Sequence, residues 1–221
     1  MNRGGARREF AAVIIDSRPI EAEVVHQHLR LLDLPRWRLY VYSSVRPSLS
    51  FDYVWTPYTY TGIGQYNWTL AGRRFWTRFS AFRRVLVFQQ DSGLLRRGME
   101  EFCKLPYDYI GAPWKPEVKW APRGDLGGNG GLSLRNPRQA LWTTWRHPYR
   151  SDYGAEDVYF TRFVRNPAPR DICAAFSCET IKITNDDPLP LGWHAYDKYH
   201  GSAALAGLRA RAQSGVLGRV G

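Results

Sequence analysis

The chain has 221 residues, of which 44% are hydrophobic and 14% aromatic, so it can bury a core and is too apolar to be disordered over most of its length. Its formal net charge of +11 favours phosphorylated or other anionic ligands. The basic residues come as dispersed pairs, which excludes a concentrated nucleic-acid footprint, and no apolar stretch is long enough to cross a membrane.

Cysteine content and the N-terminus bear on the compartment. Cys103, Cys173 and Cys178 are too few for a disulfide framework. We expect buried free thiols, with a Cys173–Cys178 bridge as the alternative. Because the apolar run at 10–15 is shorter than a signal peptide requires, we expect a cytoplasmic protein.

The N-terminal part predicts a β-α-β unit. The run FAAVII at 10–15 predicts a buried strand, apolar residues at helical spacing predict a helix over 20–32, and WRLYVY at 37–42 predicts a second strand. Ligands of such sheets bind beyond the carboxyl ends of the strands. The residues that would lie at this nucleotide-binding edge are Asp16, Ser17 and Arg18.

The middle of the chain predicts a helix and a third strand. Residues 66–79 have the spacing of one amphipathic helix with these side chains turned inward: Trp68, Ala71, Phe75, Trp76 and Phe79. VLVF at 85–88 predicts a third buried strand. The turn-forming and aromatic residues of 105–114 predict an ordered loop.

Four further elements follow. Strands are predicted at 131–135 and 179–184, and helices from Pro137 to about Trp145 and after Glu156. The alternation of strands and helices predicts one α/β domain with a Rossmann-like, mainly parallel or mixed central sheet flanked by helices. It contains no internal repeat that would indicate a solenoid.

The domain boundaries follow from composition. We expect the folded domain over 10–200, because strands and helices alternate throughout it without a linker. Residues 1–9 are expected to form a flexible N-terminus. Residues 201–221 are rich in Ala, Gly and Arg and are expected to form a weakly structured tail.

An acidic residue follows the third predicted strand. Asp91 comes after 85–88, where a side chain is held beside the ligand crevice. A carboxylate there can bind a hard divalent metal, which in turn neutralises a diphosphate. The alternative is an aspartate that caps the next turn, and this motif alone favours the alternative.

Glycines precede the predicted strand at 131–135. The cluster from Gly127 to Gly131 (GGNGG) permits close approach of a ligand to the backbone and supplies unhindered N–H donors. A flexible hairpin turn explains the same glycines equally well.

An acidic pair and a late histidine complete the candidate residues. Glu156 and Asp157 open a predicted helix, where acids often act only as caps. In a cleft, one of them could deprotonate an acceptor hydroxyl while the other binds the acceptor or orients its neighbour. His194, in a turn-rich aromatic setting, is either a structural hydrogen-bonding residue or part of a lid over a metal-bound ligand.

The order of these features resembles the GT-A glycosyltransferase plan. More closely, the strings VFQQDS, YDYIGAPW, GNGGLSLR, EDVYF and PLGWHAY resemble a family of small GT-A-like domains of undescribed function, over about residues 10–200. The resemblance implies transfer of a sugar from a nucleotide-sugar donor, with a UDP-sugar favoured, to a hydroxyl acceptor expected to be a glycan. We expect metal-assisted single displacement with inversion, and retention of the anomeric configuration is the alternative.

The resemblance gives each motif a role. The Asp-x-Asp metal motif of that plan falls on the donor-binding residues Gln89, Gln90 and Asp91. Mn²⁺ or Mg²⁺ would be held by Asp91 and His194. Asp157 and Glu156 would be the catalytic residues, with Asp157 as the base. The residues implied for acceptor binding are Trp114, Gly128, Asn129, Gly130 and Gly131.

One departure from the plan affects the metal. Gln89 replaces the first carboxylate of the motif, so we expect the metal to arrive with the donor diphosphate. Two alternatives remain open. A non-catalytic, sugar-binding relative of the same fold is favoured by Gln89. A basic nucleic-acid-binding module is favoured by the charge but leaves the acidic and glycine motifs without a role.

Overall fold

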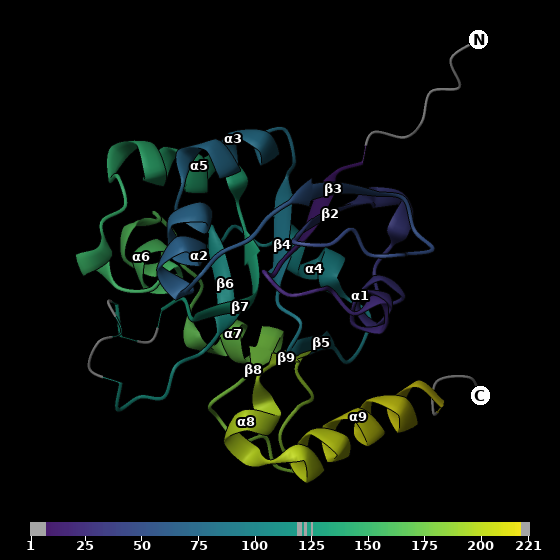
Figure 1. Ribbon diagram of the computed structural model, residues 1–221. Helices are drawn as coiled ribbons and strands as arrows, with labels where there is room; N and C mark the ends of the chain where they lie inside the picture. Colours follow the sequence, from purple (N-terminus) through teal and green to yellow (C-terminus); the bar gives the residue numbers. More distant parts are fainter. Residues whose placement is uncertain (1–7, 119–120, 122, 125, 218–221) are drawn as a thin grey trace.

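A mixed sheet forms the centre of the computed structural model, which describes residues 8–118, 121, 123–124 and 126–217 (Figure 1). Within these residues the sheet has six strands in the order β3-β2-β1-β4-β7-β6. The strands are β1 (Phe10–Ile15), β2 (Trp37–Ser43), β3 (Tyr53–Pro57), β4 (Arg84–Phe88), β6 (Tyr109–Ala112) and β7 (Asn129–Arg135). The first four are parallel, and β7 runs antiparallel to both β4 and β6. The carboxyl ends of β1 and β4 therefore meet the start of β7 at one edge.

A small second sheet lies beyond this edge. It has the order β5-β9-β8, formed by β5 (Ser92–Leu94), β9 (Gly192–His194) and β8 (Ser177–Cys178). Only residues 89–91 separate β4 from β5. Because β5 pairs with β9, the small sheet brings residues 192–194 close to the carboxyl end of β4.

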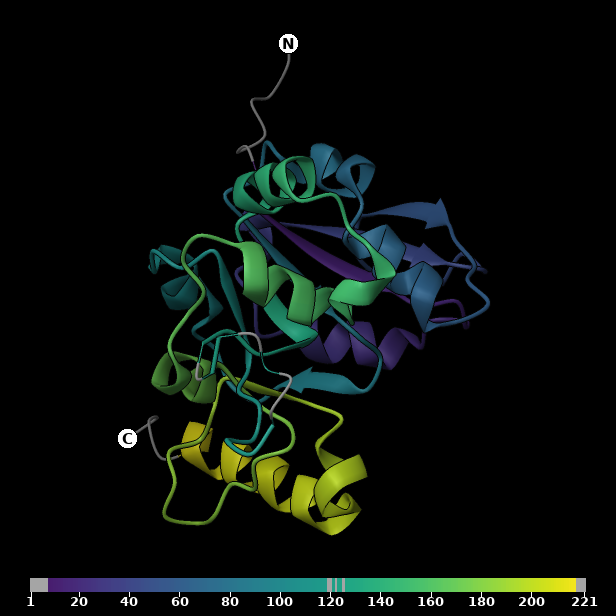
Figure 2. The same ribbon diagram turned by 90° about the vertical axis from the view of Figure 1, so that its left-hand side faces the viewer.

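Helices cover both faces of the central sheet (Figures 1 and 2). The helices are α1 (Ala22–Leu29), α2 (Ile63–Leu70), α3 (Arg73–Phe79), α4 (Met99–Lys104), α5 (Pro137–Arg146), α6 (Glu156–Phe163), α7 (Arg170–Phe176), α8 (Tyr196–His200) and α9 (Ser202–Leu217). Helices α1, α4 and α7 pack on one face, and α2, α3, α5 and α6 on the other. Short 3-10 helices are η1 (Leu34–Arg36) and η2 (Ser151–Tyr153).

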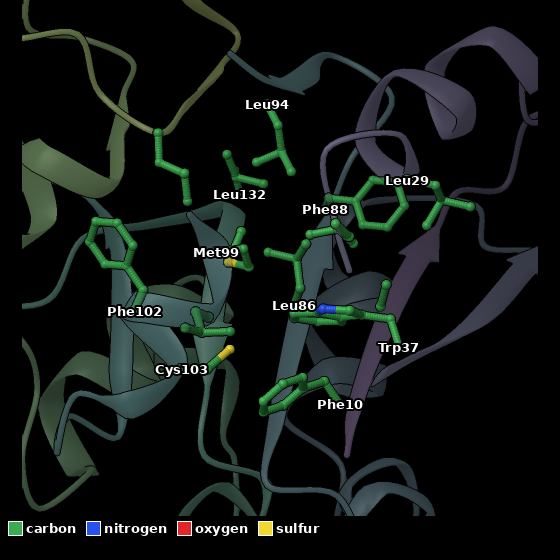
Figure 3. Close-up of a cluster of buried hydrophobic side chains, with 14 of the residues drawn as sticks. Phe10, Leu29, Trp37, Leu86, Phe88, Leu94, Met99, Phe102, Cys103 and Leu132 are labelled. Carbon is green, nitrogen blue, oxygen red and sulfur yellow. The ribbon is translucent and has the colours of Figure 1, made fainter. Parts of the chain in front are cut away.

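The first strand shows why the sheet is central. All six residues of β1 are buried. Successive side chains of a strand point to opposite faces, so Phe10 and Ile14 join one core cluster while Val13 and Ile15 join the other. Figure 3 shows the first cluster, in which Phe10 lies near Trp37 and Leu86. An uninterrupted apolar run is what a strand covered on both faces requires.

The helix predicted over 66–79 is broken in two. Gly72 is extended between α2 and α3, and a Cβ at this position would lie 2.9 Å from the Trp68 carbonyl oxygen. Four of the five predicted inward side chains are buried, but Trp68 is 55% exposed because it lies in the separate first helix.

Two further predictions were wrong. Strand β6 occupies part of 105–114, where a loop was predicted, because it pairs with β7. Residues 179–184 form no strand. At Thr184 both the backbone N–H and the hydroxyl donate to Asp187 Oδ2 at 2.7 Å, and such local bonds compete with a strand ladder.

The C-terminal segment differs most from its prediction. Most of the expected weakly structured tail is helix α9. Leu205, Leu208 and Ala212, spaced at i, i+3 and i+7, are buried against Trp193 and Tyr196. A stripe of only three apolar residues is easily missed in an Ala- and Gly-rich sequence.

At the other end, residues 1–7 of the predicted flexible N-terminus lie outside the described residues. Glu9 is ordered by ion pairs to Arg36 at 2.5 Å and Arg83 at 3.2 Å.

The cysteine prediction is confirmed, since Cys103, Cys173 and Cys178 are all free and buried. In the described part of the chain, no helix has both the length and the apolar character needed to cross a membrane.

Candidate active site

Asp16 and Arg18, two of the three residues predicted to bind a nucleotide after β1, are held by side-chain hydrogen bonds. Buried Asp16 accepts hydrogen bonds from Arg18 Nη2 at 2.7 Å and from Gln90 Nε2 at 2.9 Å. Burial raises the pKa of Asp16, but these bonds hold it below its usual value. Asp16 is therefore occupied, Ser17 is partly exposed, and the 71% exposed side chain of Arg18 is the group available to a ligand.

The predicted metal ligands lie together although 102 other residues separate them in sequence. His194 Nε2 is 3.4 Å from Asp91 Oδ1 and 3.0 Å from Gln89 Oε1. The Gln89 amide nitrogen donates to Tyr66 Oη at 2.7 Å, which turns the amide oxygen toward His194. On the other side of the ring, His194 Nδ1 lies 3.2 Å from Glu179 Oε1. Gln89 thus presents an oxygen to this cluster.

The charges in this cluster stabilise each other. Burial lowers the pKa of His194, but Asp91 and Glu179 together raise it to about 9. Burial also raises the pKa of Asp91, while His194 holds it below its usual value. The side chain of Asp91 is 54% exposed, whereas that of Glu179 is 5% exposed. Asp91 is therefore the most exposed member of the cluster.

The donor set fits a divalent cation in part. An imidazole, a carboxylate and an amide oxygen converge, and a carboxylate on the second imidazole nitrogen is common for metal-binding histidines. A metal would have to displace the proton that the pKa of about 9 keeps on His194 at neutral pH. Among the described residues, however, no group of three His, Cys, Asp or Glu side chains could hold a metal without help. Any metal here requires oxygens from a ligand.

Gly130 and Gly131 connect this cluster to the acidic pair. The Gly130 N–H donates to Asp157 Oδ2 at 3.1 Å. A Cβ at Gly130 would collide with Glu156 Oε1, and one at Gly131 would collide with the His194 ring. Asp157 and His194 therefore flank the first residues of β7 from opposite sides, which requires both glycines to lack side chains.

Glu156 and Asp157 have different environments, as expected for neighbours on a helix. Both carboxylate oxygens of Glu156 bind Arg135, at 2.5 and 2.9 Å, and both side chains are buried. Asp157 is only partly buried, and burial together with the Glu156 charge raises its pKa to about 6. Asp157 is the more exposed of the two, and its raised pKa suits a base that accepts a proton near neutral pH.

The other residues predicted to bind the acceptor lie in different environments. Asn129 Oδ1 accepts from the Gly131 N–H at 2.8 Å and so shapes the loop. At Gly128, φ is +156° and a Cβ would collide with the Ala112 carbonyl oxygen, so the glycine serves packing. Trp114 is only 6% exposed, which leaves little ring surface for a sugar in this conformation.

Comparison with known proteins places the chain in a family. A family model described as "Protein of unknown function (DUF5672)" matches residues 48–194, which is more than half of the chain. The chain belongs to this family. The matched segment of this DUF5672 member contains the Gln89–Asp91 motif, the glycine loop, the acidic pair and His194. No curated protein sequence matches the chain.

A solved structure with a similar fold is the apo-form glycosyltransferase GlyE from Streptococcus pneumoniae TIGR4. It superimposes with a TM-score of 0.53 at 13% identity, over 86% of this chain and 54% of that one. The DUF5672 member therefore has a glycosyltransferase-like fold and spans about half of the neighbour's length. The predicted α/β class is confirmed.

Several residues of the site were not predicted. Arg135 ends the GLSLR string, Glu179 lies in a segment predicted as a strand, and Tyr66 in a helix predicted only for its apolar face. His28, buried and stacked on Phe88, contacts the Oγ of Ser92, the residue after Asp91, at 3.2 Å. Arg135 ends a recognised string, but nothing in the sequence connects it with Glu156, and the other three residues stand in no recognisable motif. The charge of Arg135 beside the apolar residues Leu132 and Leu134 was the one available signal.

The contact between Gly131 and His194 gives a direct prediction. Gly131→Ala is expected to displace the His194 ring and to lower the free energy of unfolding by about 1–3 kcal/mol, because the added methyl overpacks a buried site. Gly62→Ala is the matched control, since no atom lies within 4 Å of its added Cβ. Urea unfolding of both variants measures the difference. Equal stabilities would contradict the packing of Gly131 on His194.

Proposed function

We propose that this protein is a glycosyltransferase that moves a sugar from a nucleotide-sugar donor to a hydroxyl acceptor. The observation that carries the proposal is the arrangement around Gly130 and Gly131, with a partly buried aspartate of raised pKa on one side and the Asp91–His194 cluster on the other. The glycosyltransferase-like fold supports the same function. We favour a UDP-sugar donor and a glycan acceptor.

In the proposed reaction, Asp157 accepts the proton of the acceptor hydroxyl as its oxygen attacks the anomeric carbon. The bond from that carbon to the diphosphate oxygen breaks, and the nucleoside diphosphate leaves with the bonding electron pair. One displacement of this kind inverts the anomeric configuration. Asp91 and His194 would hold Mn²⁺ or Mg²⁺ together with the diphosphate, and the bound metal would supply positive charge to the leaving group.

Two arginines have distinct parts in this proposal. Arg18 has an exposed guanidinium, and its charge and that of Asp91 act on each other's pKa, so it is placed to contact a donor phosphate beside the metal. Arg135 holds Glu156 in a buried ion pair. Glu156 is therefore a positioning residue, whose charge raises the pKa of Asp157.

One observation favours a second candidate, a non-catalytic protein that binds sugars or nucleotide sugars with the same fold. Gln89 stands where the fold's plan has a carboxylate, and its amide is already bonded to Tyr66 and His194. Stable donor binding with no release of nucleoside diphosphate, in the presence of many acceptors, would favour this candidate.

Donor binding can be tested without knowing the acceptor. We expect a UDP-sugar with Mn²⁺ to raise the melting temperature, because a ligand that binds only the folded state stabilises it. GDP-, dTDP- and CMP-sugars, each with and without Mn²⁺, complete the screen.

The metal assignment is tested in the same screen with Asp91→Asn, which should remove the Mn²⁺-dependent part of the shift. Asp33→Asn, an exposed aspartate in another part of the chain, should leave it unchanged. A stable protein that no nucleotide sugar shifts would contradict the proposed function. A full shift in Asp91→Asn would contradict the metal ligand alone.

A further inference from the structure

Helices α3 and α5 lie side by side and carry positive charge without any negative charge (Figure 1). Neither helix contains an aspartate or glutamate. Their arginines are Arg73, Arg74, Arg78, Arg138 and Arg146. Within the residues that the structure describes, none of the five forms an ion pair with a carboxylate, although Arg78 bonds to Tyr42 and Thr56. Arg73, Arg74 and Arg138 line the surface cavities of these helices, and like charges gathered there favour an anionic ligand.

Two surface cavities follow these helices. One, of about 470 Å³, is lined by residues that include Trp68, Arg73 and Tyr149, and the other, of about 410 Å³, by residues that include Arg73, Arg138 and Trp145. Arg73 and Thr77 line both, so the cavities adjoin. We call them together the α3–α5 groove.

Tryptophan rings border the groove at both ends. Trp68 is 55% exposed and Trp145 is 62% exposed. Trp68 packs edge-on against Tyr149, with 5.1 Å between ring centroids, so its position is fixed while much of its surface stays free. Exposed aromatic rings beside guanidinium groups that form no ion pair are unusual on a surface that binds nothing.

One end of the groove lies near the acidic pair, although neither Glu156 nor Asp157 lines it. Asn67 Oδ1 accepts a hydrogen bond from the Glu156 N–H at 3.3 Å, and the next residue, Trp68, lines the groove. Tyr149 also lines it, and the charges of Glu156 and Asp157 add to the effect of burial in raising the Tyr149 pKa. Helix α2 therefore links the acidic pair to the near end of the groove.

We propose that the α3–α5 groove binds an extended anionic glycan whose end is the acceptor at Asp157. The role as acceptor site rests on the proposed function, whereas the binding itself does not. The tryptophan faces suit the apolar faces of sugar rings, and the guanidinium groups suit uronate or sulfate groups, which they can bind with two parallel hydrogen bonds. A neutral glycan would leave the charge of the groove uncompensated. A nucleic acid matches the charge equally well, but the position beside a candidate sugar-transfer base favours a glycan.

Polygalacturonate, a polymer of uronic acid, is the probe. By calorimetry and by electrophoresis through gels containing the polymer, we expect the full chain to bind polygalacturonate and not neutral dextran. Arg73→Glu/Arg138→Glu should weaken this binding about tenfold or more, since charge-assisted hydrogen bonds are replaced by repulsion. Trp145→Ala should weaken it about threefold or more through lost ring contact, while its exposed position keeps the melting temperature unchanged.

The matched control is Arg30→Glu/Lys182→Glu, which makes the same change in charge at two exposed positions away from helices α3 and α5. The control should bind polygalacturonate nearly as well as the wild type. Equal weakening in control and groove variants would reduce the effect to net charge and overturn the proposal. Tighter binding of poly(dT), or of vesicles containing phosphatidylglycerol, at equal charge concentration would overturn it in favour of a nucleic acid or a membrane.

Measurements of donor binding on the same samples distinguish a failure of this proposal from a failure of the proposed function. Nucleotide-sugar shifts are measured for wild type and groove variants together. Loss of polygalacturonate binding with the donor shift intact supports the groove as a separate subsite. If the wild type binds a donor but no polygalacturonate, the groove proposal fails and the proposed function stands.

Discussion

Asp157→Asn is expected to lower the rate of sugar transfer about 10²–10⁴-fold, the usual contribution of a positioned general base. The variant keeps a side chain of the same shape, and its amide oxygen can still accept one of the two backbone hydrogen bonds that Asp157 receives from Gly130 and Val158. The measurement is release of nucleoside diphosphate with the donor identified by thermal shift. A folded variant with full activity would remove Asp157 from the mechanism.

The pH dependence of the wild type follows from the same residue. With a pKa of about 6, Asp157 is protonated and inactive at pH 5 and ionised at pH 7.5, so the rate should rise through pH 6 and then level off. The folded pKa lies above the usual aspartate value, so the folded state binds the proton more tightly than the unfolded state. Ionisation of Asp157 therefore lowers the free energy of unfolding as pH rises from about 4 to 6.

The raised pKa of Asp157 also predicts the stability of Asp157→Asn, which shows whether the variant is correctly folded. Asp157→Asn removes an ionised group that the fold disfavours, so at pH 7.5 the variant should unfold at the same temperature as the wild type or a higher one. A melting temperature well below that of the wild type would mean that Asp157 is mainly structural, and the loss of activity would then say nothing about a base.

Arg135→Met is expected to destabilise the protein by about 3–5 kcal/mol, because it leaves the buried carboxylate of Glu156 without its partner. The guanidinium also lies over the rings of Tyr109, at 5.0 Å, and Phe160, at 5.2 Å, and a methionine keeps only part of this packing. Urea unfolding measures the change.

The matched control is Arg150→Met, which breaks an ion pair with Asp152 whose side chains are 67% and 59% exposed. Exposed pairs contribute about 0–1 kcal/mol, so this variant should unfold almost like the wild type. The double variant Arg135→Met/Glu156→Leu should recover much of the loss, since it removes both charges. If Arg135→Met and Arg150→Met are equally stable, the buried pair does not hold the acidic helix in place.

Most of the sheet could be predicted because burial on two faces leaves a local signature. The apolar runs of β1 and β4 need no knowledge of their neighbours. The break at Gly72 and the docking of α9 could not be predicted in this way. The first depends on a turn within an otherwise helical pattern, and the second on whether a weak apolar stripe finds a partner, which Trp193 provides.

The sequence pointed to those residues of the candidate site that belong to short sequence motifs. Asp91, Asp157 and His194 were found through their neighbours in sequence, and the fold places them at one edge. Glu179 and Arg135 act only through a residue far away in the chain. Their importance appears when topology pairs them, which no spacing rule encodes.

The two glycines at the start of β7 also limit how this site can evolve. The space that a side chain would fill at Gly130 is taken by Glu156, and that at Gly131 by His194. A larger residue at either position can be accepted only if the opposite side chain shrinks or moves, which alters the acidic pair or the histidine cluster. Drift in this short stretch of backbone is therefore tied to change in the chemistry on both sides of it.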